Sequence, residues 1–265
     1  MLTIMLIYLG LGAVVGILAG LLGVGGGLVI VPMVVFTLTW QGAPSQYLMH
    51  LALGTSLASI IFTSISSFWA HHKRGAVRGL VVRRIVLGIL TGTFLGSCLA
   101  ARLSTNLLEG VFVVFLYYMA FQMLTNTKPK PTRGLPGPLG MFAVGNGIGA
   151  VSSLVGIGGG SLSVPFMAWC NVTVHDAIGT SAAIGFPIAI AGTVGYIVNG
   201  LNVSDLPAYC LGYVYLPALA GIVAASVFTA PLGVRLAHSL PVARLKRVFA
   251  LLLFVMGTKM LIGLF

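Results

Sequence analysis

Acidic residues are almost absent from this sequence: its 265 residues include three Asp or Glu against fourteen Lys or Arg. Charged residues make up 6% of the chain, whereas soluble domains carry about 25%. Hydrophobic residues make up 58%, and they occur in long runs. This composition excludes an ordinary soluble domain and predicts an all-α integral membrane protein that crosses the lipid bilayer several times.

Most of the few charged residues lie in or near the predicted loops. Glu109, Asp176 and Asp205 all fall near predicted loops, so no carboxylate is expected in the membrane interior. A cation pump built on buried carboxylates is therefore disfavoured. The basic residues lie in short loops between apolar runs, so the net charge of +11 reflects orientation in a membrane and does not indicate a nucleic-acid partner.

Cysteine is scarce as well. Cys98, Cys170 and Cys210 are scattered through apolar sequence without metal-ligand spacing, which predicts neither a disulfide nor a zinc site. The chain also shows no combination of nucleophile, base and orienting residue. We therefore expect no enzyme activity, no metal and no cofactor.

Glycine, in contrast, is abundant, and its densest run occurs twice. Gly20–Pro32 reads GLLGVGGGLVIVP, and Ser153–Pro165 reads SLVGIGGGSLSVP. Each glycine costs about 1 kcal/mol in a helix relative to alanine, so each copy predicts a break between two helical pieces. In lipid, such a break is tolerated where the freed backbone groups are buried in protein or line a watery cavity. Matched breaks in two halves of a chain are typical of the binding site of a secondary transporter.

The apolar runs between loops predict the helices. Leu2–Leu22 lacks a basic leader and a small-residue cleavage site, so we expect a retained membrane segment. Leu28–Trp40 is too short to span, because a crossing needs roughly 20 residues, and the depth of the break stays open. The other helices are expected near Tyr47–Ala70, Ile85–Ala101, Leu107–Thr125, Leu139–Val155, Ser161–Cys170, Ala177–Val198, Leu206–Val234 and Val248–Phe265.

The repeat extends beyond the glycines. His50–Ser56 ends in Gly-Thr-Ser, as does His175–Ser181, and both follow a glycine-rich break. A segment rich in proline, glycine and positive charge separates the two copies. We therefore expect a first repeat at 1–127, a cytoplasmic linker at 128–138 and a second repeat at 139–265.

The basic residues indicate that the repeats are inverted. His71–Arg84 contains five Lys or Arg, whereas its counterpart Asn199–Tyr209 contains none. Arg235–Arg247 contains four, whereas Arg102–Glu109 contains one. The positive-inside rule places such equivalent loops on opposite sides of the membrane. Each repeat then consists of a glycine-broken helical hairpin plus three transmembrane helices, with both termini on the non-cytoplasmic side of the cell membrane.

The backbone after each break can bind an anion. The first N–H groups of the following helix, from Leu28 or Ser161, lack partners and carry the positive end of the helix dipole. Glycine lets a ligand approach this backbone closely, which predicts an anion site without a charged side chain. The alternative is that the glycines serve only close helix packing.

Side chains near the breaks add further candidates. The hydroxyls of the Gly-Thr-Ser triplets can donate to an anion, although they can also bond back to their own helix or hold helices together. His50 and His175 lie four residues before the glycine of each triplet and are candidates for proton coupling. An interfacial location without a role in transport is the alternative for both histidines.

The doubled Gly-x-Gly-Gly-Gly…Pro and Gly-Thr-Ser motifs resemble the TauE/SafE family of membrane anion exporters. The likeness covers nearly the whole chain. It implies a secondary transporter for a small anion of the sulfite, sulfoacetate or related sulfonate type. The substrate-binding residues carried over by motif are Gly25, Gly26, Gly27, Thr55, Ser56, Gly158, Gly159, Gly160, Ser161, Thr180 and Ser181.

We therefore predict export of a small sulfur-containing anion by alternating access, with proton coupling as an option. The expected partners are the anionic substrate and the lipid bilayer, and assembly as a homo-oligomer stays open. The alternatives are an uptake carrier for another organic or inorganic anion, a passive anion channel, and a structural membrane subunit without transport.

Overall fold

The computed structural model describes residues 2–22, 26–125, 133–239 and 242–263. Ten α-helices account for most of this described part, which confirms the all-α membrane class, and one short antiparallel hairpin is the exception. The predicted site residue Gly25 and residues 128–132 of the predicted linker lie outside the described residues. The elements are α1 (Leu2–Leu22), α2 (Gly27–Trp40), η1 (Ser45–Tyr47), α3 (Leu48–His72), α4 (Gly79–Ala100), α5 (Thr105–Thr125), α6 (Pro138–Val155), α7 (Gly160–Trp169), α8 (Val174–Gly200), β1 (Cys210–Leu211), β2 (Val214–Tyr215), α9 (Leu216–Ser239) and α10 (Val242–Gly263).

The helices differ in length, and the two that follow the breaks are the shortest α-helices of the described part. Among the described residues, five are long and apolar enough to cross a membrane, namely α3 with η1, α4, α5, α6 and α8. The helices that follow the two breaks are short, with 14 residues in α2 and 10 in α7. At about 1.5 Å per residue, these two rise only about 21 and 15 Å, less than the hydrocarbon thickness of about 30 Å. The 14 residues of α2 agree with the expectation that Leu28–Trp40 is too short to span.

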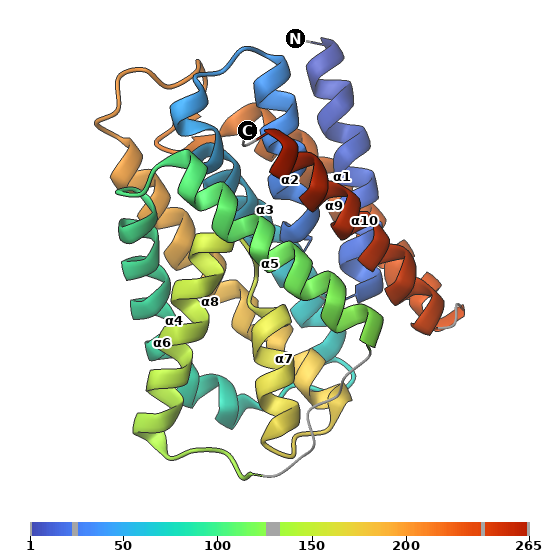
Figure 1. The fold of residues 1–265 in the computed structure, drawn as a ribbon. Coiled ribbons are helices and arrows are strands. Elements are labelled where there is room, and N and C mark those ends of the chain that lie inside the picture. The colour runs from blue at the N-terminus through green and yellow to red at the C-terminus, as the bar shows by residue number, and fades with distance from the viewer. Residues whose placement is uncertain (1, 23–25, 126–132, 240–241, 264–265) are drawn as a thin grey trace.

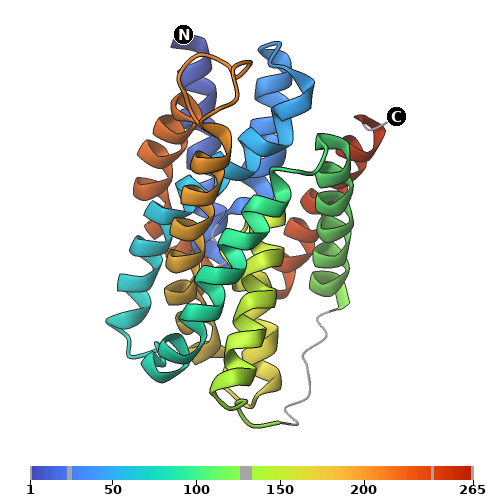
Figure 2. The same cartoon turned by 90° about the vertical axis from the view of Figure 1, so that its left-hand side faces the viewer.

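The two halves of the chain interlock. α3 packs against α8 in the centre, and α1 runs beside α9, α4 beside α6, and α5 beside α10 (Figures 1 and 2). Glycines bring the outer pairs close: a methyl group on Gly12 of α1 would lie 2.5 Å from the carbonyl oxygen of Ile222, and one on Gly145 of α6 would lie 2.6 Å from that of Ile85. Each of these pairs takes one helix from each half, so neither half has a core of its own.

Several helix ends differ from the sequence-based expectation. α4 begins at Gly79 and not near Ile85, so Arg83 and Arg84 lie in its first turns. Long basic side chains can extend from a helix end into the interface, so they do not require a loop. The helix expected from Leu206 begins only at Leu216, after the β1–β2 hairpin. α10 likewise begins at Val242, earlier than expected.

Candidate functional site

The two glycine breaks have the same backbone geometry. Gly26 precedes α2 with φ 77°, and Gly159 precedes α7 with φ 75°, a left-handed conformation that glycine adopts without steric cost. The Gly26 carbonyl accepts from the N–H groups of Val29 and Ile30, each at 3.0 Å. The Gly159 carbonyl accepts in the same way from Leu162 at 3.0 Å and Ser163 at 2.8 Å. The first two N–H groups of each short helix have no acceptor within their own helix and remain open to a ligand.

The breaks lie against each other. A methyl group on Gly27 would collide with the carbonyl oxygen of Gly156, the residue that ends α6. Ser56 on α3 donates to this same oxygen at 2.7 Å, and its side chain is fully buried. The structure thus brings together three predicted features: the first break, the second break and the serine of the first Gly-Thr-Ser triplet.

The contacts of the second break show how far along the central helices it lies. A methyl group on Gly158 would lie 3.1 Å from Cγ2 of Ile60, and one on Gly185 would lie 3.0 Å from the Gly158 carbonyl oxygen. Ile60 is near the middle of α3, and Gly185 is near the middle of α8. The break therefore lies halfway along the two central helices, as Figure 1 shows for the adjoining ends of α6 and α7.

Buried hydroxyl groups without partners surround the second break. The side chains of Ser152, Ser161 and Ser163 are 0%, 5% and 0% exposed, and their Oγ atoms make no hydrogen bond to the described part of the chain. The Ser152 Oγ atom lies 3.6 Å from the position of a methyl group on Gly159, so it faces the start of α7. Native interiors rarely leave such groups unpaired, which makes them indicators of a ligand.

Two of these three serines were missed from the sequence. Ser161 is among the predicted site residues, but Ser152 and Ser163 are not. The available signal was the Ser161-Leu-Ser163 pattern directly after the glycines, where the first break has Leu28 and Ile30. The comparison of the two halves favoured positions with the same residue in both copies, whereas Ser152 and Ser163 have no serine at the equivalent positions of the first half.

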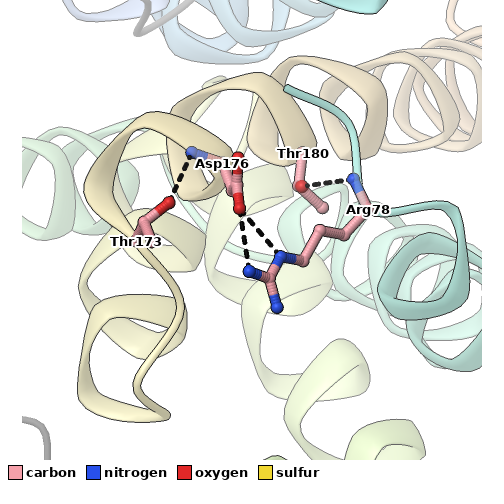
Figure 3. Close-up of polar contacts among 4 residues, drawn as sticks. All are labelled: Arg78, Thr173, Asp176 and Thr180. Carbon is pink, nitrogen blue, oxygen red and sulfur yellow. Dashed lines mark hydrogen bonds and ion pairs between the residues drawn. The ribbon is translucent and has the colours of Figure 1, made fainter. Parts of the chain in front are cut away.

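The threonines of the triplets contact loops of the opposite half. Thr55 accepts a hydrogen bond from the Tyr215 N–H at 2.9 Å, and Thr180 accepts one from the Arg78 N–H at 3.0 Å (Figure 3). The glycine before each threonine packs tightly too, since methyl groups on Gly54 and Gly179 would collide with the carbonyl oxygens of Tyr213 and Ala76. We call residues 76–78 and 213–215 the two straps. Ser181 is buried and donates to Ile178 of its own helix at 2.8 Å.

One strap also carries an ion pair. Figure 3 shows Arg78 reaching to Asp176 in the first turn of α8, where the Nη2 and Oδ2 atoms are 2.9 Å apart. Both side chains are partly exposed, at 47% and 26%, so the pair contributes little to stability. Thr173 caps the same turn by accepting from the Asp176 N–H at 3.3 Å.

The two candidate histidines have different surroundings. His50 is 3% exposed, and its Nε2 atom lies 3.1 Å from the Ala100 carbonyl oxygen, while Nδ1 has no partner in the described part of the chain. Its ring stacks on Tyr213, with ring centroids 5.0 Å apart. His175 is exposed in the first turn of α8. Only His50 is buried, and the two residues lie at opposite ends of the molecule.

Comparisons with known proteins agree with this architecture. Residues 8–260 match the family described as "Sulfite exporter TauE/SafE". A "Probable membrane transporter protein" of Haemophilus influenzae is 40% identical over 262 residues, which cover 98% of this chain and 99% of the relative. A relative in Methanocaldococcus jannaschii is 26% identical over 95% of this chain and 93% of its own length, and YunE of Bacillus subtilis is 29% identical over 72% and 77%. Both carry the description of probable membrane transporter proteins.

No solved structure gives a significant match to the chain. The family match spans nearly the whole sequence, and the relatives' names support a membrane transporter and not an enzyme. Together with the apolar spans and the paired breaks at mid-depth, these matches show that the chain belongs to the TauE/SafE sulfite exporter family.

Proposed function

We propose that this protein is a secondary transporter that exports a small sulfur-containing anion, such as sulfite, sulfoacetate or a related sulfonate, from the cell. The anion binds where the two breaks meet. The observation that carries this proposal is the start of α7, where open N–H groups and the unpartnered buried hydroxyl of Ser161 face the interior at mid-depth. The sulfur chemistry and the direction of transport come from the family description.

Binding without a charged side chain suits a transporter. A helix N-terminus provides about half a positive charge, and the start of α2 at Gly27 packs against Gly156, the C-cap of α6, four residues before α7 begins. No lysine or arginine is buried among the residues whose side chains the structure describes. The site can therefore bind an anion less tightly than a buried guanidinium would, so that the anion can be released.

The proposal includes inverted repeats. In Figure 1, α1 descends from the N-terminus whereas α6 ascends, and the central helices α3 and α8 also run in opposite directions. The straps are reciprocal as well, because Thr55 holds the second-half strap and Thr180 holds the first-half strap. With the basic loops inside, both termini and the 213–215 strap lie on the non-cytoplasmic side, and the 128–138 linker is cytoplasmic.

The straps supply the two gates that alternating access requires. On the cytoplasmic side, the 76–78 strap is joined to α8 by the Arg78–Asp176 ion pair and by Thr180 (Figure 3). On the opposite side, Tyr215 donates to Gln41 at 3.0 Å, and Gln41 donates to Tyr8 at the same distance. Release of one strap while the other stays bound opens the central site to one side at a time.

Counterflow in proteoliposomes tests this function. Vesicles loaded with unlabelled sulfite should accumulate labelled sulfite faster than empty vesicles, because a carrier exchanges substrate across the membrane. A channel would only equilibrate the label, and a structural subunit would not move it. Counterflow by the wild type and its loss in a folded Gly159→Val variant support the proposal, whereas flux without trans-stimulation overturns the carrier mechanism.

A further inference from the structure

We propose that one singly charged oxyanion binds at the second break alone, held by the first N–H groups of α7 and by Ser152, Ser161 and Ser163. This inference rests on the proposed function and deepens it, because it assigns the site to one of the two breaks and the substrate to one charge class.

The three serines differ from most buried hydroxyls of this protein. The Ser59 hydroxyl donates to the Thr55 carbonyl at 2.8 Å, and the Ser226 hydroxyl donates to the Val223 carbonyl at 3.4 Å, each within its own helix. Such back-bonding is the usual way in which a buried serine is satisfied in a helix. Ser152, Ser161 and Ser163 make no such bond in the described part of the chain. Their burial is similar, because Ser152 and Ser163 are fully buried, as Ser59 and Ser226 are, and Ser161 is 5% exposed. A bound oxyanion supplies the missing acceptors.

The three serines lie on either side of one helix start. Ser161 and Ser163 lie in the first turn of α7, and Ser152 lies at the end of α6, with its Oγ atom beside Gly159. The open N–H groups of Gly160 and Ser161 belong to the same turn. Donors from the backbone and from side chains thus belong to the residues on either side of Gly159, the arrangement that an oxyanion with several acceptor oxygens requires.

The first break lacks this chemistry. When the two glycine runs are aligned, the positions of Ser152, Ser161 and Ser163 are occupied by Ala19, Leu28 and Ile30. Leu28 is 1% exposed and Ile30 is fully buried, so both place hydrocarbon at the start of α2. Burial of a second anion there would remove it from water without replacing its hydrogen bonds. We therefore expect one bound anion per chain.

The available positive charge limits the anion to a single negative charge. The start of α7 provides about half a positive charge, and no buried lysine or arginine adds to this among the residues whose side chains the structure describes. A doubly charged anion would keep more than one uncompensated charge in a medium of low dielectric constant. The site accordingly favours a simple sulfonate over sulfoacetate or sulfate, which carry two charges.

Equilibrium dialysis of the purified protein with labelled methanesulfonate tests the proposal. The wild type should bind one methanesulfonate per chain, and excess sulfate should compete at least about tenfold less well than unlabelled methanesulfonate. Ser161→Ala, Ser163→Ala and Ser152→Ala should each weaken binding by about 10- to 100-fold, the effect of one lost hydrogen bond to a charge. The matched controls Ser59→Ala and Ser226→Ala, whose hydroxyls are already bonded, should leave it unchanged. Without ligand, the three site variants should melt no lower than the wild type.

The outcomes separate this inference from the proposed function. Two anions per chain, equal competition by sulfate, or unchanged binding in all three alanine variants would overturn the inference, while counterflow would continue and the proposed function would stand. Absence of both binding and counterflow in the wild type would defeat both. A binding loss that is equally large in the control variants would assign the effect to folding and also reject the three serines as ligands.

Discussion

Hydroxyl groups have two roles at the scale of single residues. Thr55 and Thr180 accept hydrogen bonds from the backbone of the straps, and Ser56 donates to the Gly156 carbonyl. Ser152, Ser161 and Ser163 are buried in the same interior and have no hydrogen-bond partner in the described part of the chain. The residue types are the same, so the neighbouring backbone decides which hydroxyl holds the fold and which is free to bind an anion.

Replacement of Thr55 by valine tests the first role. The Tyr215 N–H would lose its acceptor in a buried environment, which should lower the free energy of unfolding by about 1–3 kcal/mol. Thr55→Ser keeps the oxygen and should remain near the wild type. Melting temperatures in detergent, followed by fluorescence-detected chromatography, provide the measurement. An unchanged melting temperature combined with a loss of methanesulfonate binding would instead make Thr55 a substrate ligand, as its motif implies.

Replacement of the histidines tests proton coupling. His50 faces the rings of Tyr47 and Tyr213, and its buried Nδ1 atom is open to a proton, while His175 is exposed. The double variant His50→Gln and His175→Gln should flatten the pH dependence of counterflow, because a glutamine side chain cannot take up a proton. The single His50→Gln variant should have most of this effect, because only His50 is buried. An unchanged pH profile in active double-variant protein would remove both histidines from the mechanism.

At the scale of elements, two short helices place their N-termini inside the molecule, whereas a helix that spans the membrane has both ends at its surfaces. α2 and α7 start in the middle of the molecule, so their N-termini, and with them the positive ends of their dipoles, lie at mid-depth. The left-handed glycines Gly26 and Gly159 make these starts possible, because a side chain at positive φ would strain the backbone. In the proposed function, anion binding thus belongs to the start of the short helix and not to any charged residue.

The valine substitution at Gly159 tests this element. A side chain there would adopt an unfavourable backbone conformation, collide with Ile188 and fill the approach to the start of α7. Gly159→Val should therefore abolish counterflow while the protein still inserts in the membrane. Gly147→Ala is the matched control, since Gly147 lies in α6 with nothing near its missing side chain, and it should raise stability by about 0.5–1 kcal/mol. Full counterflow in Gly159→Val would exclude the break as the binding site.

At the scale of the whole molecule, the two halves depend on each other. Each of the four helix pairs, α1 with α9, α3 with α8, α4 with α6 and α5 with α10, combines one helix from each half. Each strap is likewise held by the triplet of the other half. In the proposed mechanism, a displacement of one half would therefore move the contacts of both straps, which would couple the two gates.

Cysteine labelling tests the proposed orientation. In a background with Cys98, Cys170 and Cys210 replaced by serine, Asn202→Cys should react with a membrane-impermeant maleimide in intact cells. Lys73→Cys should react only after permeabilisation, because the basic loop lies in the cytoplasm. The reverse pattern would invert the topology, and equal labelling of both positions from outside would reject inverted repeats.

Much of this architecture could be predicted from local properties of the sequence. The apolar runs placed the helices because burial in lipid requires hydrocarbon side chains. The glycine runs placed the two breaks because the helical cost of glycine is a property of each residue. The hairpin at 210–215 was not predicted, because it depends on Tyr209 at φ 67° just before β1 and on a hydrogen bond from the Tyr213 N–H to the Tyr196 carbonyl of α8.

The sequence by itself determined that the chain is a membrane protein with paired helix breaks, because composition and backbone propensity act residue by residue. Only the tertiary structure decided which hydroxyls remain free beside those breaks. Ser181 bonds back to its own helix, whereas Ser161 has no partner among the described residues, although both were equal candidates in the sequence. The reason is that a hydrogen bond depends on which backbone groups neighbouring helices bring within reach, and that is a property of packing.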